Sequence, residues 1–291
     1  MAMTGGGDPV AAIREQDATG ETAALYEDIR RTLGVPVVNL VWRHLATIPG
    51  GLPWAWARVR PLYRSGLIAA EAQALHAALD LPDLPAWPSE ALRAAGLAPA
   101  DEQGIRRVLD AYNRSNGMNL IALSALLLEL DGAAGTAPAP IPAAAQGGVG
   151  GGANDRLPDL LPLSEMAPAT AALVEALNRL GERADAPILA SMYRHLAHWP
   201  PFLALAWTLI APLDADGRLT TSIVDGLQHA RGRAAALLGG LGPAPAELDA
   251  AARAPLRAAL DSFTTHPIGK MVTICALLRR AMPARETDDR A

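Results

Sequence analysis

The two halves of this chain repeat one another at a fixed offset. Residues Pro36 to Ala46 align with Pro187 to Ala197, and 187 − 36 = 151. The same offset pairs Trp56 with Trp207. A repeat this long constrains the fold strongly, because both halves must be built on one plan. We therefore predict two similar halves packed about a pseudo-twofold axis, with a small-molecule pocket at their shared interface.

The residue types within each half favour an all-α fold. Ala and Leu, which have high helix propensities, dominate a chain that is 51% hydrophobic. Strand-forming Val, Ile and Thr are sparse and scattered. The apolar spacing predicts helices over residues 22–33, from 36 onward, and over 52–63, 69–79 and 101–112. A turn at Ser115-Asn-Gly117 is expected to start a sixth helix that ends near Leu130.

The segment between the halves differs from both of them in composition. Residues 132–158 are rich in Ala, Pro and Gly, with Gly150-Gly-Gly152 near the end. Such a segment has too little apolar side-chain surface to form a core and is typical of a flexible linker. The predicted organisation is a first helical repeat over 1–131, this linker, and a second repeat over 159–291.

Charge and motifs exclude several classes of function. The formal net charge is −5 and no long basic block is present, which argues against binding nucleic acid. Cys275 is the only cysteine, so no zinc or CxxC motif exists, and a reducing cytoplasm is the expected location. The longest apolar stretch, 202–213, is too short to span a bilayer, and no signal peptide is evident. No phosphate-binding or dinucleotide-binding motif follows a strand, so no cofactor is expected.

An Arg-His pair occurs once in each half, as Arg43-His44 and Arg194-His195. Either arginine could clamp a carboxylate. Because the pair recurs at matched positions, we favour a structural role in the shared scaffold. His195 and His198 are three residues apart, but a metal site needs further ligands and none is evident nearby.

One polar segment occurs in the first half alone. Residues 112–119 contain three asparagines, whereas the matched segment 263–270 contains none. Asparagine suits turns and helix caps, which is the structural interpretation. A single site in a duplicated protein must be built where the halves differ, and this favours Asn116 as a functional residue.

Several segments together resemble the group I 2-haloacid dehalogenases, which are all-helical enzymes with a tandem duplication. The resemblance is carried by residues 32–38, 45–53, 112–116 and 160–163, and by Ala190-Ser191 leading into 196–200. It covers nearly the whole chain outside the linker. In that family an Asp and an Asn hold a water, which attacks the halogen-bearing carbon directly with inversion and without a covalent ester.

The resemblance assigns roles to particular residues of this chain. The Ser-Asp pair of the family aligns with Ser191-Met192 of this chain. Met192 therefore stands in place of the aspartate that activates the water, and its thioether cannot accept a proton. A second acidic residue of functional note in the family aligns with Ala69 of this chain, which has no carboxylate. The nearest substitute carboxylate is Asp185, seven residues before Met192. Asn116 matches the water-holding amide, with Asn113 as second choice, and the remaining implied pocket residues are Val37, Leu40, Ser65 and Phe263.

The sequence is compatible with two functions. The first is a hydrolase of a small (halo)carboxylic acid that uses altered catalytic residues. The second is an inactive member of the family that binds a small apolar acid or serves as an interaction module. A homodimer is possible in either case. A carboxylate that converges on one cavity with Ser191 and Asn116 favours the enzyme, and a purely apolar cavity favours binding.

Overall fold

The computed structural model describes residues 10–35, 37–135, 157–182, 188–245 and 247–284, and within these ranges every regular element is a helix. The all-α prediction is therefore confirmed. The first half contains α1 (Gly20–Leu33), α2 (Leu40–Leu45), α3 (Gly51–Arg64), α4 (Leu67–Ala78), α5 (Ser89–Ala94) and α6 (Pro99–Leu130). The second half contains α7 (Pro168–Arg179), α8 (Ser191–Leu196), α9 (Pro200–Ala215), α10 (Arg218–Ala236), α11 (Ala250–Phe263) and α12 (Gly269–Ala281).

Several helices of the second half begin 151 residues after a helix of the first half. The offset is 191 − 40 = 151 for α8 and α2, and 218 − 67 = 151 for α10 and α4. It is 250 − 99 = 151 for α11 and α6. The helix starts therefore follow the offset found in the sequence.

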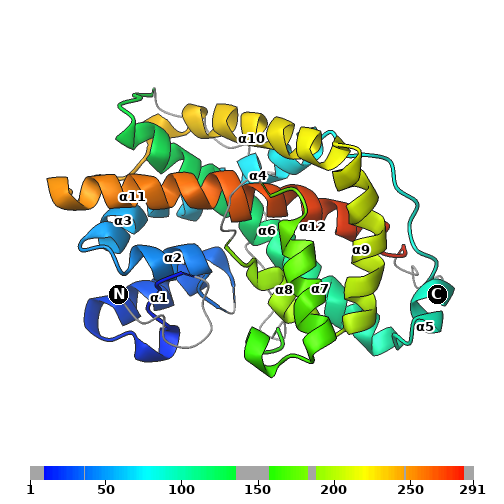
Figure 1. Ribbon diagram of the computed structural model, residues 1–291. Coiled ribbons are helices and arrows are strands. Elements are labelled where there is room, and N and C mark those ends of the chain that lie inside the picture. The colour runs from blue at the N-terminus through cyan, green and yellow to red at the C-terminus, as the bar shows by residue number, and fades with distance from the viewer. Residues whose placement is uncertain (1–9, 36, 136–156, 183–187, 246, 285–291) are drawn as a thin grey trace, which may run out of the picture.

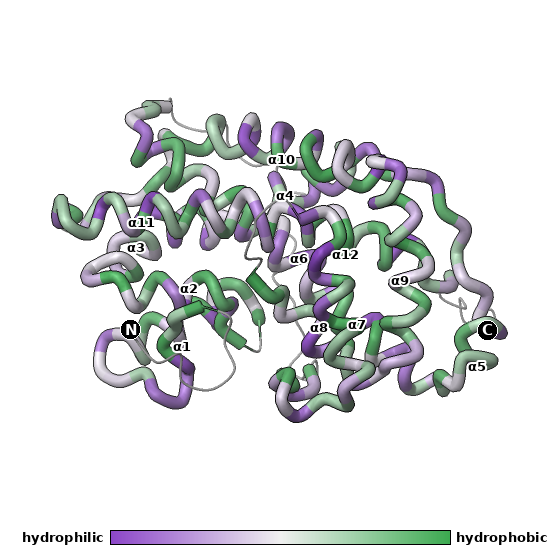
Figure 2. The backbone as a smooth tube through the Cα atoms, viewed as in Figure 1, coloured by the Kyte–Doolittle hydropathy of each residue, from purple (hydrophilic) through white to green (hydrophobic). Residues whose placement is uncertain are grey.

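Helix α6 is the central element of the fold. It packs against α3, α4, α8, α10, α11 and α12. Figure 1 shows α1 to α3 at one end of the molecule and α7 to α9 toward the other, with α6 and α12 between them and α11 lying along α3. Every residue from 115 to 127 is buried. A helix buried all round needs apolar residues on every face, and the green stretches of Figure 2 mark such residues along the central helices.

The predicted turn at Ser115-Asn-Gly117 is wrong, because α6 runs through it without a break. Turn-forming residues continue a helix here because tertiary packing outweighs their local preference. The side chain of Asn119 accepts hydrogen bonds from Trp42 Nε1 at 3.2 Å and Tyr63 OH at 3.0 Å. A Cβ atom at Gly117 would lie 2.8 Å from His76 Nε2, so this position needs glycine for close packing.

The matched position in the second half is irregular. A π-helical turn, Thr264–Ile268, joins α11 to α12 and contains Pro267. Proline cannot donate the hydrogen bond that an α-helix needs, so a widened turn at this point is consistent with its chemistry. The two central helices therefore differ in backbone geometry where their sequences differ most.

The described residues carry one main cluster of buried side chains, drawn from both halves. Leu157, Leu161 and Leu163 pack against it from the segment that enters α7. Of the predicted linker, residues 136–156 lie outside the described residues, as does Pro36. None of the described helices combines the length and the apolar character needed to cross a membrane.

Candidate functional site

A small cavity of about 60 Å³ lies where α2, α6, α8 and the π-helical turn meet. Its walls are mostly apolar, with a few polar groups among them. The segments that precede α2 and α8 contribute to the lining, together with the first residues of both helices. The lining residues are Val37–Val41, Arg43, Tyr112, Asn116, Asn119, Leu160, Ile188–Met192, Phe263, Pro267, Ile268 and Met271.

The structure brings six of the sequence-predicted site residues to this cavity, namely Val37, Leu40, Asn116, Ser191, Met192 and Phe263. Two others are not among its lining residues. Ser65 follows the last residue of α3, where its hydroxyl donates to Leu62 O at 3.1 Å. Asn113 lies on α6 with its backbone carbonyl bonded to His76 Nε2 at 2.9 Å. Asp185 lies outside the described residues.

Among the described lining residues, Arg43 is the cationic side chain. It is 7% exposed, and its Nε donates to Val38 O at 3.2 Å. The matched Arg194 donates from Nε to Leu161 O at 2.9 Å. Both arginines therefore bind backbone carbonyls, in agreement with a role in the scaffold. Arg43 additionally places positive charge beside the cavity, which favours an anionic ligand.

Sulfur atoms form one wall behind the cavity. Met192 has no exposed surface, and its Sδ lies 3.1 Å from the Sγ of Cys275 on α12. The side-chain amide of Asn116 approaches the same Sγ at 3.7 Å. Burial raises the pKa of the Cys275 thiol to about 12, so it stays protonated at neutral pH. This wall is apolar and polarizable, and it supplies no base.

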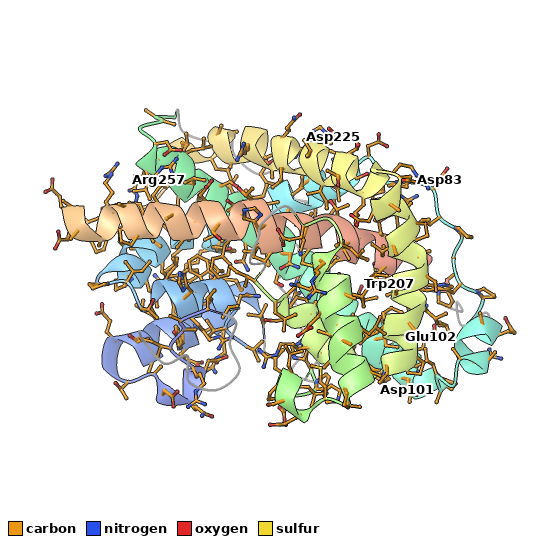
Figure 3. The ribbon with its side chains drawn as sticks, in the orientation of Figure 1. Asp83, Asp101, Glu102, Trp207, Asp225 and Arg257 are labelled. Carbon is orange, nitrogen blue, oxygen red and sulfur yellow. The ribbon has the colours of Figure 1, made fainter. Side chains whose placement is uncertain are left out.

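No aspartate or glutamate of the described part of the chain lines the cavity. Glu71, two residues from the position of the second family acid, pairs with Arg233 on α10 at 2.9 Å. The labelled acids Asp83, Asp101, Glu102 and Asp225 lie on outer parts of the molecule in Figure 3. Among the residues that the structure describes, no group of three metal-binding side chains was found either.

A tyrosine that lines the cavity meets a histidine behind it. Tyr112 OH lies 2.8 Å from His195 Nδ1, and their ring centroids are 5.6 Å apart. Burial raises the pKa of Tyr112 and lowers that of His195 to about 4, so both are neutral at pH 7. Ser191, which also lines the cavity, opposes this effect by lowering the pKa of Tyr112. The sequence indicated neither Tyr112 nor this pairing.

The lowered pKa of His195 predicts a pH-dependent stability. Between pH 6.5 and about 4 the unfolded chain binds the proton and the folded chain does not, so folding weakens as the pH falls. The contribution of His195 to this loss is up to about 3 kcal/mol. Chemical denaturation across this window should show a smaller loss of unfolding free energy for His195→Gln than for the wild type. Equal losses in both proteins would contradict the prediction.

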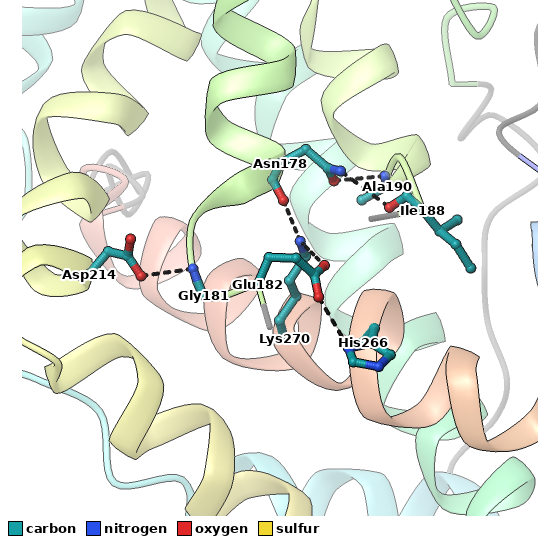
Figure 4. A network of polar contacts seen from close by, with 8 residues as sticks. All are labelled: Asn178, Gly181, Glu182, Ile188, Ala190, Asp214, His266 and Lys270. Carbon is teal, nitrogen blue, oxygen red and sulfur yellow. Dashed lines mark hydrogen bonds and ion pairs between the residues drawn. The ribbon is translucent and has the colours of Figure 1, made fainter. Parts of the chain in front are cut away.

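A buried network supports the segment that leads into α8 (Figure 4). Lys270 Nζ lies 2.7 Å from Glu182 Oε2 and also donates to the backbone carbonyl of Asn178. The Asn178 side chain accepts from Ala190 N at 3.0 Å and donates to Ile188 O at 3.3 Å. Since Ile188 and Ala190 line the cavity, this network fixes part of its wall.

Comparison with known proteins agrees with this all-helical fold. A configuration-inverting 2-haloacid dehalogenase of Alcaligenes xylosoxydans xylosoxydans is 32% identical over 197 residues. That alignment covers 66% of this chain and 65% of the relative. A second configuration-inverting enzyme, from Pseudomonas sp. (strain 113), is 29% identical over 76% of this chain and 74% of its own length.

A solved structure shares the fold over almost the whole chain. A D-2-haloacid dehalogenase in complex with L-LA superposes with a TM-score of 0.72 and 19% sequence identity, covering 94% of this chain and 96% of that one. No family model matches the sequence. The sequence relatives and the shared fold therefore support the resemblance of this chain to the group I 2-haloacid dehalogenases, and the first of these relatives is matched over slightly less than two thirds of its length.

Proposed function

We propose that this protein binds a small carboxylic acid with an apolar tail in the cavity between α2 and α8, and that it hydrolyses 2-haloacids slowly. The observation that carries the proposal is the composition of the cavity. It combines apolar walls with one arginine, three amides (Asn39, and Asn116 and Asn119 on α6) and two hydroxyl groups, but has no carboxylate among its described lining residues. This set suits a small organic anion.

The position of the cavity is part of the proposal. We infer that the halves are tandem repeats related by a pseudo-twofold axis, and that the cavity belongs to their interface. The common offset of the helix starts supports this inference, as does a lining drawn from α2 and α6 in one half and from α8, α11 and α12 in the other.

The carboxylate end of the ligand is expected to face Arg43. A positive charge at an enclosed site attracts an anion more strongly than it would in bulk water, because the effective dielectric constant is lower. The apolar side chains Val37, Leu40 and Phe263 would then surround the tail and remove it from water. The names of the relatives make 2-haloacids the first ligands to test.

Slow turnover follows from the groups that surround the reacting carbon. Displacement of halide by water at a saturated carbon requires a group that takes the proton of the water. Met192 stands where the family resemblance implies that group, and its thioether has no such capacity. Loss of a general base costs roughly 10²–10⁴-fold in rate.

The ligand can be varied without altering the protein. Calorimetric titration should show that 2-chloropropionate binds at least about tenfold more tightly than 2-chloropropionamide, which keeps the shape but lacks the negative charge. Similar affinities for the acid and the amide would contradict the proposal that Arg43 faces the carboxylate of the ligand. Absence of binding by either compound would overturn the proposed function.

An inactive binding member of the family is the second candidate. The sulfur wall of Met192 and Cys275 favours it, because this wall fills space without supplying a base. Sensitive measurement of halide release by the purified protein separates the two candidates. A homodimer and a cytoplasmic location stay predictions from the sequence.

A further inference from the structure

We propose that Tyr112 and His195 form a proton-accepting relay at the cavity, and that this relay replaces the missing carboxylate in the slow hydrolysis. The inference rests on the proposed function, because it concerns the same cavity and the same small acids. It concerns the hydrogen-bonded pair of Tyr112 and His195 together with Ser191, and both Tyr112 and Ser191 line the cavity.

The hydrogen bonds define the direction of the relay. In the proposed tautomer the ring N–H of His195 lies on Nε2, in agreement with the backbone carbonyl of Pro158, which raises the pKa of His195 and can only accept a hydrogen bond. A neutral imidazole carries one N–H, and Nδ1 is therefore the acceptor that faces Tyr112 OH at 2.8 Å. Tyr112 accordingly donates to His195 and turns an oxygen lone pair toward the hydroxyl of Ser191. A water beside Ser191 could donate to that same oxygen.

The Tyr112–His195 pair has a counterpart in the other half of the chain that lacks the tyrosine hydroxyl group. At the repeat offset His195 matches His44 (195 − 44 = 151), and Tyr112 matches Phe263 (263 − 112 = 151). His44 and Phe263 also lie against each other, with ring centroids 5.5 Å apart. The fold thus keeps an aromatic ring beside a histidine twice, but only one ring carries a hydroxyl group. The hydroxyl is not needed for this packing, which points to a chemical role.

The proposed step balances as a hydrolysis. The water oxygen forms a bond to the carbon that carries the halogen, and the carbon–halogen bond breaks with its electron pair, releasing halide. One proton of the water passes to the Tyr112 oxygen while the phenolic proton of Tyr112 passes to His195 Nδ1. The products are the 2-hydroxy acid, halide and a protonated imidazole, which later returns its proton to solvent. Tyr112 is the catalytic residue here, and His195 is a positioning residue that acts through it.

The test compares three single variants with the wild type. Tyr112→Phe removes only the hydroxyl, and the chain already places Phe at the matched position. His195→Gln keeps a hydrogen-bond acceptor of similar size that cannot take the proton. Tyr193→Phe is the matched control, because Tyr193 is fully buried on α8 and its hydroxyl has no partner in the described structure. Halide release from 2-chloropropionate and calorimetric binding are measured for each protein.

We expect Tyr112→Phe and His195→Gln to lower kcat by about tenfold or more with little change in the dissociation constant, and Tyr193→Phe to lower neither. Adding Met192→Asp to Tyr112→Phe should then restore halide release, because a new carboxylate bypasses the relay. Wild-type rates in both relay variants would overturn the relay alone. A wild type that binds the acid but releases no halide would overturn both the relay and the slow hydrolysis, and would leave the binding of the acid standing. A wild type that does not bind the acid would overturn the proposed function, and the relay with it.

Discussion

Replacing Met192 by Asp is expected to raise the rate of halide release from 2-chloropropionate by about 100-fold or more. The side chain is fully buried beside Ser191 and Asn116, at the position where the family resemblance implies the water-activating carboxylate. An aspartate there could accept the proton of an attacking water directly, and a general base contributes roughly 10²–10⁴-fold. Aspartate is also smaller than methionine, which leaves room for the water.

The control for this experiment is Met192→Asn. Asparagine has nearly the shape of aspartate and creates a similar space, but it cannot take up a proton. Halide release from both enantiomers of the substrate is measured for the wild type and the two variants, together with their thermal unfolding. If the Asn and Asp variants are equally fast, space and not basicity limits the reaction, and the assignment of position 192 is wrong.

Much of the helical architecture could be predicted because it depends on repeated, local features of the sequence. The offset of 151 residues relates several helices of the two halves, and the Ala- and Leu-rich composition favours helix along most of the chain. The prediction failed at residues 115–117, where Ser, Asn and Gly are typical of a turn. The residues on either side of them in α6, Asn113 and Asn119, form hydrogen bonds with Trp42, Tyr63 and His76, which lie 37 or more residues away along the chain.

The cavity itself could be predicted only in part, for a related physical reason. Family resemblance placed Val37, Leu40 and Ser191, which the structure brings to one cavity. The hydrogen bond from Tyr112 to His195 joins residues 83 positions apart, and no local pattern indicates it. A comparison of matched positions could have found it, since Tyr112 and Phe263 differ at the repeat offset just as the asparagines do.

Replacing Lys270 by Met is expected to lower the free energy of unfolding by about 3–5 kcal/mol. The side chain of Lys270 is 1% exposed and that of Glu182 is 5% exposed, and Lys270 Nζ lies 2.7 Å from Glu182 Oε2. Burial lowers the pKa of Lys270 while its contact with Glu182 opposes this, as expected for a charge held inside by its partner. The substitution keeps the volume of the lysine but removes the charge that neutralises a buried carboxylate.

The double variant Lys270→Met with Glu182→Gln separates charge from packing. It removes both charges, so most of the lost stability should return if the penalty is electrostatic. His266 Nδ1, 3.1 Å from Glu182 Oε1, can still hydrogen-bond to a glutamine at this position. Urea denaturation of the two single variants, the double variant and the wild type gives the coupling energy directly.

The same substitution links the stability of the fold to the cavity. Lys270 donates a hydrogen bond to the backbone carbonyl of Asn178. The Asn178 side chain in turn hydrogen-bonds to the backbone of Ile188 and Ala190, which directly precede Ser191 and Met192. Loss of this support should loosen the wall that precedes α8, so Lys270→Met should also weaken binding of 2-chloropropionate under conditions where the variant is still folded. A variant that loses stability but binds the acid with wild-type affinity would show that the network stabilises the fold without shaping the cavity.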